Sequence, residues 1–201
     1  MEKMLNKKNI VVFDFDGTLS RKDSNFEFGK YCLKHYVRPW VYLPIVMIAY
    51  FGRMLNPAGI WWRTTMRAFI TPDMIKDLAP KFIKQHKKLR FNWAKSVVAN
   101  ERARGNIVIL ISAGTDYLVP YLANDMKFDV VLTSKMNAKK PWQYDFLCWG
   151  PNKVIALDTW ARDNKIIPNV VRAYSDSKSD LPIMSIAKDR VWIDRKTGLK
   201  K

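Results

Sequence analysis

The sequence predicts an α/β fold in which a parallel sheet forms the core and one helical segment is inserted. Short strand-like runs recur along the chain, and helical patterns separate the later ones, an alternation typical of a parallel sheet with helices on both faces. Residues 20 to about 95 instead contain many helix formers and no strand alternation. A length of 201 residues suits one core with a modest insertion.

The expected strands are five short apolar runs. In the first, residues 10–13, four apolar residues follow one another without interruption, which suits a strand that is covered on both faces. The others are residues 107–111, 129–132, 170–174 and 190–193. Because helical patterns separate the later runs, we expect the strands to lie parallel in one sheet.

The long interval between the first two strands is the expected helical insertion. A TPDM sequence resembles a helix start, with Thr71 as N-cap and Pro72 at the first helical position. Apolar residues then recur at helical spacing, at Ile75, Leu78, Phe82, Leu89, Trp93 and Val97. We therefore assign residues 20–95 to the insertion and residues 1–19 and 96–201 to the core.

Composition and charge restrict the class of protein. Hydrophobic residues make up 48% and charged residues 26% of the chain, which argues against a disordered chain and an integral membrane protein. The net charge of +17 predicts an attraction to anionic lipid or nucleic acid that falls with added salt. Cys32 and Cys148, far apart and without a CxxC pair, are expected to be reduced thiols. Because the polar N-terminus lacks the apolar stretch of a secretion signal, we expect a cytoplasmic protein.

Two carboxylates follow the first expected strand. After Asp14 and Asp16, Gly17 permits a sharp turn and Thr18 adds a hydroxyl, so these groups can converge on one small volume. Carboxylates this close repel one another unless a cation compensates them, and Mg²⁺ prefers oxygen ligands. The segment therefore predicts a magnesium site, the alternative being an ordinary strand end followed by a turn.

This segment, DFDGT, resembles the nucleophile motif of the haloacid dehalogenase (HAD) superfamily of phosphohydrolases. Three further matches occur in the order of that family: Ser112 after the second strand, Lys153 at the start of a later helix, and Asp176 with Asp180 after another strand. The resemblance implies a Rossmann-like core. It also implies, for the phosphoserine-phosphatase-like branch (subfamily IB), a helical cap domain between the first two motifs, which closes over the site and selects the substrate.

The resemblance also assigns roles to these residues. Asp14 would be the nucleophile that attacks phosphorus and becomes an aspartyl-phosphate, and Asp16 the general acid and base. An acid at this second position favours phosphoryl transfer over the dehalogenase reaction. The implied cofactor is Mg²⁺, with one oxygen of Asp14, the backbone carbonyl of Asp16 and the carboxylate of Asp176 as protein ligands.

The other motif residues would bind phosphate or support the residues that do. The hydroxyl of Ser112 and the amides that follow it, through Gly114, would bind phosphate oxygens at the start of a helix. Lys153 would neutralise the remaining negative charge. Asp180 would support the metal or Lys153. The alternative for Asp180 is a helix N-cap, since Leu-Pro follows it.

Three residues are candidates for substrate contact, namely Asp23, Thr18 and Gly114. Asp23 falls where relatives that dephosphorylate phosphoserine place a glutamate. The acidic motif, YSDSKSDLP, departs from the Gly-Asp-Gly-x-Asn-Asp pattern of phosphoserine phosphatases, with Ser179 where the Asn would fall. It is similar instead to other relatives of that enzyme, which include bacterial phosphatases of the phosphatidylglycerophosphate type.

The insertion contains an apolar run and an excess of positive charge. Residues 39–52, PWVYLPIVMIAYFG, contain no charge and lie between Arg38 and Arg53. Since a bilayer span needs about 20 apolar residues, this run predicts either a buried helix or an interfacial segment. Residues 20–105 contain 17 Lys or Arg against 5 Asp or Glu, and their basic run predicts either a solvated helix face or a surface that attracts anions. That run comprises Lys81, Lys84, Lys87, Lys88 and Arg90.

Three functions remain in view. The first is a Mg²⁺-dependent phosphatase, with a phospholipid headgroup phosphate as a candidate substrate and peripheral contact with the anionic inner face of the membrane. The second is a soluble small-molecule phosphatase of the phosphoserine phosphatase type. The third is a basic nucleic-acid-binding protein, which is the weakest because no finger, helix-turn-helix or RNA-binding motif is present. The sequence gives no indication of the oligomeric state.

Overall fold

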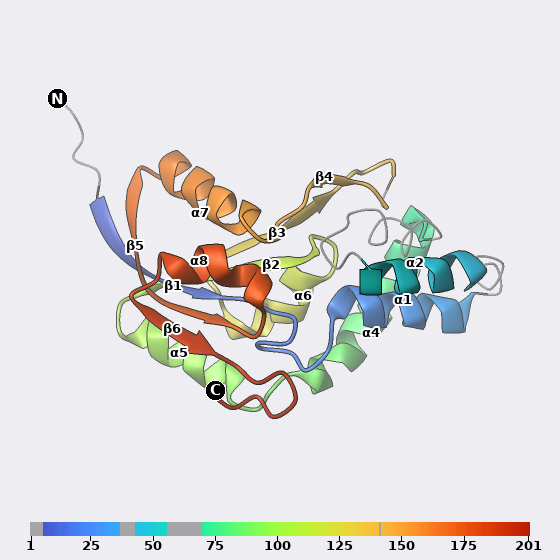
Figure 1. Ribbon diagram of the computed structural model, residues 1–201, viewed down its shortest axis with the longest axis horizontal. Coiled ribbons are helices and arrows are strands. Elements are labelled where there is room, and N and C mark those ends of the chain that lie inside the picture. The colour runs from blue at the N-terminus through green and yellow to red at the C-terminus, as the bar shows by residue number, and fades with distance from the viewer. Residues whose placement is uncertain (1–5, 37–42, 56–69, 141) are drawn as a thin grey trace.

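The computed structural model describes residues 6–36, 43–55, 70–140 and 142–201. In this part of the chain the strands form one six-stranded sheet in the order β4-β3-β2-β1-β5-β6 (Figure 1). The strands are β1 Asn6–Phe13, β2 Ile107–Thr115, β3 Val130–Met136, β4 Tyr144–Phe146, β5 Ile166–Ser175 and β6 Asp189–Trp192. Neighbouring strands are parallel except β3 and β4, which are antiparallel. The expected α/β fold with a parallel core is confirmed.

The strands β2, β3 and β5 are longer than the expected runs, and β1 and β4 also differ from the sequence-based expectation. The strand β1 begins at Asn6 rather than Ile10, and its first residues are exposed. These residues pair with β5 alone, because pairing with β2 starts at Ile10, and they therefore carry no apolar signal. The strand β4 has three residues and lies at the edge of the sheet, so it contains no apolar run long enough to indicate a strand.

Alternate residues of β1 point to opposite faces of the sheet and join two separate cores. The elements that cover the sheet are α5 Ala94–Ala103, α6 Val119–Ala123, η3 Asn124–Met126, α7 Asn152–Asp163, η4 Lys178–Asp180 and α8 Leu181–Ser185. Val11 and Phe13 belong to the core that includes residues of α5 and α6. Ile10 and Val12 belong to the core that includes residues of α7 and α8. Burial on both faces explains the uninterrupted apolar run of this strand.

The insertion between β1 and β2 is helical in its described parts, as expected. Its elements are α1 Ser24–His35, α2 Leu43–Leu55, α4 Pro72–His86 and the short η2 Lys87–Leu89. The helix start is confirmed, because the hydroxyl of Thr71 accepts a hydrogen bond from the amide of Met74 at 3.3 Å. Residues of α1 and α4 extend the core on the α5 side, where Phe28 and Phe82 meet edge to face with ring centroids 5.2 Å apart.

Two chain segments connect the insertion to the sheet. The amide of Phe91 donates to the carbonyl of Leu19, and the amide of Arg21 donates to the carbonyl of Leu89, both at 3.0 Å. This extended pairing separates α4 from α5, so the helical spacing seen in the sequence spans two helices rather than one. The position of the domain boundary at residue 95 stays a prediction.

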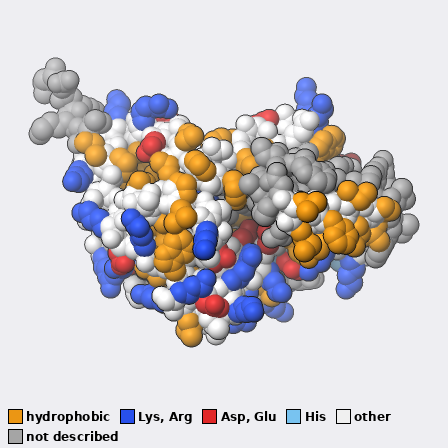
Figure 2. Space-filling view, in the orientation of Figure 1, with side chains coloured by type: hydrophobic (Ala, Val, Ile, Leu, Met, Phe, Trp, Pro, Cys, Tyr) orange, Lys and Arg blue, Asp and Glu red, His pale blue; other side chains and the backbone are white. Residues whose placement is uncertain are grey.

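The helix α2 carries apolar side chains that face solvent. Their exposed fractions lie between 44% and 89%, and Figure 2 shows them gathered at one end of the molecule. They are Met47, Ile48, Tyr50, Phe51, Met54 and Leu55. Within the uncharged run, Met47, Ile48, Tyr50 and Phe51 are therefore not buried core, whereas Gly52 is buried. Residues 38–42 and the side chains of Ile45, Val46 and Ala49 lie outside what the structure describes. No helix among the described residues is long and apolar enough to cross a bilayer.

Candidate active site

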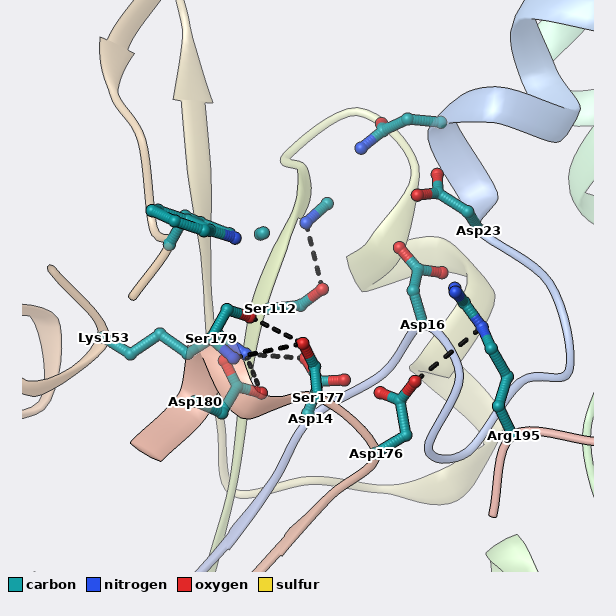
Figure 3. A pocket seen from close by; sticks show the side chains of 14 residues that line it. Asp14, Asp16, Asp23, Ser112, Lys153, Asp176, Ser177, Ser179, Asp180 and Arg195 are labelled. Carbon is teal, nitrogen blue, oxygen red and sulfur yellow. Dashed lines mark hydrogen bonds and ion pairs between the residues drawn. The ribbon is translucent and has the colours of Figure 1, made fainter. Parts of the chain in front are cut away.

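The carboxyl ends of β1, β2 and β5 meet at one edge of the sheet, where they form a pocket (Figure 3). Asp14 follows β1, Asp176 follows β5, Ser112 lies near the end of β2, and Lys153 lies in the first turn of α7. All of the sequence-predicted site residues except Thr18 line this pocket. The fold therefore brings together motifs that are far apart in the sequence.

Lys153 is buried between two carboxylates. Its ammonium nitrogen lies 2.7 Å from Oδ1 of Asp14 and 2.8 Å from Oδ2 of Asp180. Burial alone would lower the pKa of Lys153, but the two carboxylates outweigh it and hold the pKa above its ordinary value, so the side chain stays charged. Asp180 also accepts a hydrogen bond from the hydroxyl of Ser175 at 2.7 Å. Asp180 therefore positions Lys153, and although it stands at the N-cap position of α8, its side chain makes no capping hydrogen bond there.

Thr18 connects the two carboxylates that follow β1 and β5. Its hydroxyl oxygen lies 3.0 Å from Oδ2 of Asp14 and 3.3 Å from Oδ1 of Asp176, and it accepts the amide hydrogen of Asp176 at 3.0 Å. The side chain is fully buried beneath the pocket and does not line it. Gly17 has a φ of +89°, and a Cβ atom there would lie 2.2 Å from Oδ2 of Asp176. Thr18 thus contacts both carboxylates from a buried position, and its contact with substrate stays a prediction.

The donor atoms around Asp14 and Asp176 suit a hard divalent cation. Both carboxylates approach the hydroxyl oxygen of Thr18, so their oxygen atoms lie close together. Carboxylate oxygens are ligands that Mg²⁺ prefers. Burial and the neighbouring Asp180 raise the pKa of Asp176, against the opposing effects of Arg195 and Thr18. Among the described residues no three Asp, Glu, His or Cys side chains lie close enough to hold an ion by themselves. The expected site needs two carboxylates and one backbone carbonyl, so the residues present fit it.

The negative charge of Asp14 is only partly offset by the positive charge of Lys153, and the pKa of this carboxyl is raised. Burial raises its pKa to about 7, Lys153 opposes this rise, and the carboxylates of Asp180 and Asp176 add to it. Its two oxygens contact Lys153 and Thr18, so the carboxylate is held in one orientation. A fixed, buried carboxylate at the end of a strand is suited to attack an electrophile held in the pocket.

Asp16 is held by the first residue of α1. Its carboxylate accepts hydrogen bonds from the amide and the hydroxyl of Ser24, both at 2.9 Å. Burial, followed by the negative charges of Asp23 and Asp14, raises the pKa of Asp16 well above its ordinary value despite these bonds. A carboxyl group that keeps its proton can act as a general acid. Asp23 also lines the pocket, where its side chain caps α1 by accepting from the amide of Phe26 at 2.9 Å.

The segment after Ser112 has a different conformation from the expected one. The strand β2 continues to Thr115, and the next helix, α6, begins only at Val119, so no helix N-terminus lies at Ser112. The hydroxyl oxygen of Ser112 instead accepts the amide hydrogen of Gly114 at 3.0 Å. This bond leaves the hydroxyl hydrogen free to point at an anion. A Cβ atom on Gly114 would lie 2.3 Å from Cγ2 of Val119, so only glycine fits the turn.

Several residues of the pocket wall were not expected from the sequence. Arg195 is the main one, with Nε 3.7 Å from Oδ2 of Asp176. Asn25, Trp149 and Ser177 also line the pocket. The signal for Arg195 was present, because it follows the predicted strand 190–193 and the carboxyl ends of parallel strands meet at one edge.

Comparison with known proteins places these observations in a family. The family model of the haloacid dehalogenase-like hydrolases matches residues 11–185. A protein of unknown function from Bordetella pertussis Tohama I superposes with a TM-score of 0.79 at 15% identity, covering 96% of this chain and 93% of that one. A phospho-aspartyl intermediate analogue of phosphoserine phosphatase gives a TM-score of 0.65 at 18% identity, covering 94% and 87%. A substrate-bound phosphoserine phosphatase complex gives 0.65 at 16% identity, with the same coverage.

The structural matches show a shared fold, whereas the family match concerns the sequence itself. No curated protein matches the chain. The matched range includes all four motifs, from Asp14 to Asp180. The motifs, their order and their convergence in one pocket agree with that match. The chain therefore belongs to the haloacid dehalogenase-like hydrolases.

Proposed function

We propose that the protein is a Mg²⁺-dependent phosphomonoester hydrolase that works through an aspartyl-phosphate on Asp14. One observation carries the proposal. Asp14 is buried, 2.7 Å from the ammonium of Lys153, and two residues from Asp16, whose protonated form is favoured by burial. The pocket thus pairs a nucleophile with an acid. The fold shared with a phospho-aspartyl intermediate analogue of phosphoserine phosphatase supports the same reading.

The reaction proceeds in two displacements at phosphorus. In the first, an oxygen of Asp14 attacks phosphorus, and the bond to the leaving oxygen breaks as that oxygen takes the proton of Asp16. In the second, the ionised Asp16 takes a proton from a water molecule whose oxygen attacks phosphorus and releases Asp14. Lys153 and the hydroxyl of Ser112 bind phosphate oxygens and offset their charge throughout.

The remaining residues prepare the site for this chemistry. Mg²⁺ would be held by Asp14, Asp176 and the backbone carbonyl of Asp16, and when bound it would supply positive charge that offsets the charge of the phosphate. Thr18 orients the two carboxylates, and Asp180 holds Lys153 in place. These last two residues act through others.

Hydrolysis of an aryl phosphate, with Mg²⁺ or with EDTA, tests this function. We expect turnover that requires the metal and falls by about 10³-fold or more in Asp14→Asn, which removes the nucleophile with little change in shape. Asp163→Asn, an exposed change on α7, is the matched control and should keep full activity. Metal-independent turnover, or turnover that survives in Asp14→Asn, would contradict the proposal.

We further propose that the substrate is the phosphate of a phospholipid headgroup and that the protein binds the anionic inner face of the membrane peripherally. Ile48, Phe51 and Leu55 are spaced three and four residues apart, which places them on one face of α2, and all are more than half exposed. An apolar helix face beside an excess of positive charge suits an interfacial helix. The soluble phosphoserine-type alternative leaves this face without a partner among the residues that the structure describes.

Binding to vesicles separates these two substrate classes. We expect cosedimentation with vesicles that contain phosphatidylglycerol, and weaker binding as salt is added. Phe51→Ser should reduce the affinity about tenfold, since it removes one large apolar side chain from the interface. Ile155→Ser, equally exposed on α7, should have no effect. Absence of cosedimentation in wild type would favour a soluble substrate, and equal binding by both variants would show that this face of α2 does not contact the lipid.

The nucleic-acid alternative loses support from the basic run of the insertion. Lys81 pairs with Asp77 at 2.7 Å, and Arg90 pairs with Asp125 at 2.6 Å, so part of the run is already neutralised within the protein. The acidic pocket would also repel phosphates without a metal. Retention of an oligonucleotide at physiological salt without turnover would restore this alternative.

A further inference from the structure

The residues that follow β6 form a turn that is built into the molecule. The carboxylate of Asp194 accepts the amide hydrogens of Lys196 and Thr197, both at 2.9 Å, and its carbonyl accepts the amide hydrogen of Gly198 at 2.7 Å. Gly198 has a φ of +76°, and a Cβ atom there would lie 2.4 Å from the ring of Phe91. The turn is therefore closed by its own hydrogen bonds and packed closely against the junction of the insertion.

Arg195 belongs to this turn, and the N–H donors of its guanidinium are not used by described residues. Its side chain is 44% exposed and lines the pocket. The contact of Nε with Asp176, at 3.7 Å, is too long for a hydrogen bond, and the guanidinium donates none to any described residue. Arg90 is different, because it is 16% exposed and donates to both oxygens of Asp125, at 2.6 and 3.0 Å. A guanidinium has five N–H donors, so Arg195 has donors left for a ligand.

Arg195 lies on the side of the pocket where the leaving group of the substrate would be. In Figure 3, Lys153 lies on the side of Asp14 away from Arg195, whereas the guanidinium of Arg195 extends past Asp176 toward Asp16. The transferred phosphate, which Lys153 would bind, thus lies on the side away from Arg195. Because Asp16 gives its proton to the leaving oxygen, the alcohol portion of the substrate must lie near Asp16 and hence near Arg195.

We propose that Arg195 determines specificity by binding a second anionic group, carried by the alcohol portion of the substrate; this inference rests on the proposed phosphatase function. Asp16, which holds its proton for the leaving oxygen, offers no positive charge to an anion, and the carboxylate of Asp23, which also lines the pocket, would repel one. Lys153 is buried between two carboxylates and directed elsewhere. The substrate class is therefore a phosphomonoester of an alcohol that also carries a phosphodiester or a carboxylate, which guanidinium groups bind in pairs of parallel hydrogen bonds.

Two matched pairs of probes test this inference. Phosphoserine and phosphoethanolamine differ by one carboxylate, and glycerol 3-phosphate can be compared with its methyl phosphodiester derivative on the far hydroxyl. For each pair, the ratio of kcat/KM with and without the second anion is measured in wild type, Arg195→Met and Arg195→Lys. We expect Arg195→Met to lower the ratio by about 10- to 100-fold in one pair, mainly through KM, and Arg195→Lys to restore part of it. The pair that responds identifies the anion.

The outcomes separate this inference from the function on which it rests. If Arg195→Met lowers kcat/KM equally for both members of each pair, Arg195 acts only through Asp176 and the inference fails while the phosphatase function stands. If wild type hydrolyses no probe in the presence of Mg²⁺, the phosphatase function fails. Thermal unfolding of each variant checks that the fold is kept. Lys178→Met, at an exposed lysine that also follows a strand of the sheet, controls for the loss of one positive charge.

Discussion

The pocket at the edge of the sheet buries charged side chains, whereas the helix α2 exposes apolar ones. In the pocket, buried charged groups are matched at short range, as Lys153 shows with two carboxylates within 2.8 Å. On α2, apolar side chains such as Leu55, 89% exposed, lie in solvent without a described partner. In the pocket the chain itself supplies the counter-charges of Lys153, whereas the apolar face of α2 has no partner among the described residues. We infer from this contrast that the chemistry resides in the pocket and that contact with a lipid surface resides on α2.

Removing the buried cation should produce the largest effect. Lys153→Met leaves Asp14 and Asp180 buried without a counter-charge, and the loss of one partner from a buried pair costs about 3–5 kcal/mol of unfolding free energy. Activity should fall with it. Urea unfolding measures the loss, and exposed Lys84→Met is the control. Adding Asp180→Asn to Lys153→Met removes one unpaired charge and should recover part of the stability; no recovery would mean that Asp180 has another role.

In the metal-free protein, Asp14 should contribute a loss of stability as the pH rises from about 4 to 7, whereas buried His86, whose pKa is lowered from 6.5 to about 4, contributes in the opposite direction between those two values. The pKa of Asp14 is raised from 3.8 to about 7, so between these values the native state holds a proton that the unfolded chain has released. At Asp14 the native state then binds more protons than the unfolded state, and this contribution to stability falls with rising pH. Urea unfolding in EDTA at several pH values measures this slope. Asp14→Asn should shift it toward positive values, and an unchanged slope would assign the effect to Asp16 and Asp176 alone.

Loss of the Thr18 hydroxyl should have an intermediate effect. Thr18→Val keeps the shape but leaves the amide of Asp176 and one oxygen of Asp14 without a partner, at a cost of about 1–3 kcal/mol. Mg²⁺ affinity should also fall, by about 10- to 100-fold, because the two carboxylates lose their common orientation. Calorimetric titration with Mg²⁺ measures this, with exposed Thr159→Val as the control. Unchanged affinity would place the metal away from these carboxylates.

The exposed face of α2 should contribute least to folding. Because Phe51 is 57% exposed, Phe51→Ser should change the unfolding free energy by no more than about 0.5 kcal/mol in the absence of lipid. The same variant should bind vesicles more weakly, as described above. Destabilisation like that of Lys153→Met would show that this face packs within the protein and would remove the contrast between the two regions.

The strands and the motif residues could be predicted from the sequence because their signals are local. Ile10 to Phe13 form one apolar run, and Asp14 follows it directly. The conformation after Ser112 could not be predicted in this way, because β2 continues to Thr115 through pairing with β3, which is a long-range contact. Burial of Thr18 likewise depends on Asp176, far away in the sequence.

Arg195 illustrates a different limit. Its strand, β6, was predicted within one residue, but the direction of a single side chain after it depends on the turn closed by Asp194 and packed on Phe91. Nothing local in the sequence indicates that packing. The sequence also could not predict whether the apolar side chains of α2 are exposed, because an uncharged helix has the same composition whether it is buried or interfacial.

The most direct test of the central claim is to trap the covalent intermediate. Wild type is quenched with acid during turnover of an aryl phosphate in Mg²⁺, and the peptide that contains Asp14 is examined by mass spectrometry. We expect one phosphoryl group on Asp14 that hydroxylamine removes, as for an acyl phosphate, and none in Asp14→Asn. Turnover without label on Asp14, or label on another residue, would contradict the account.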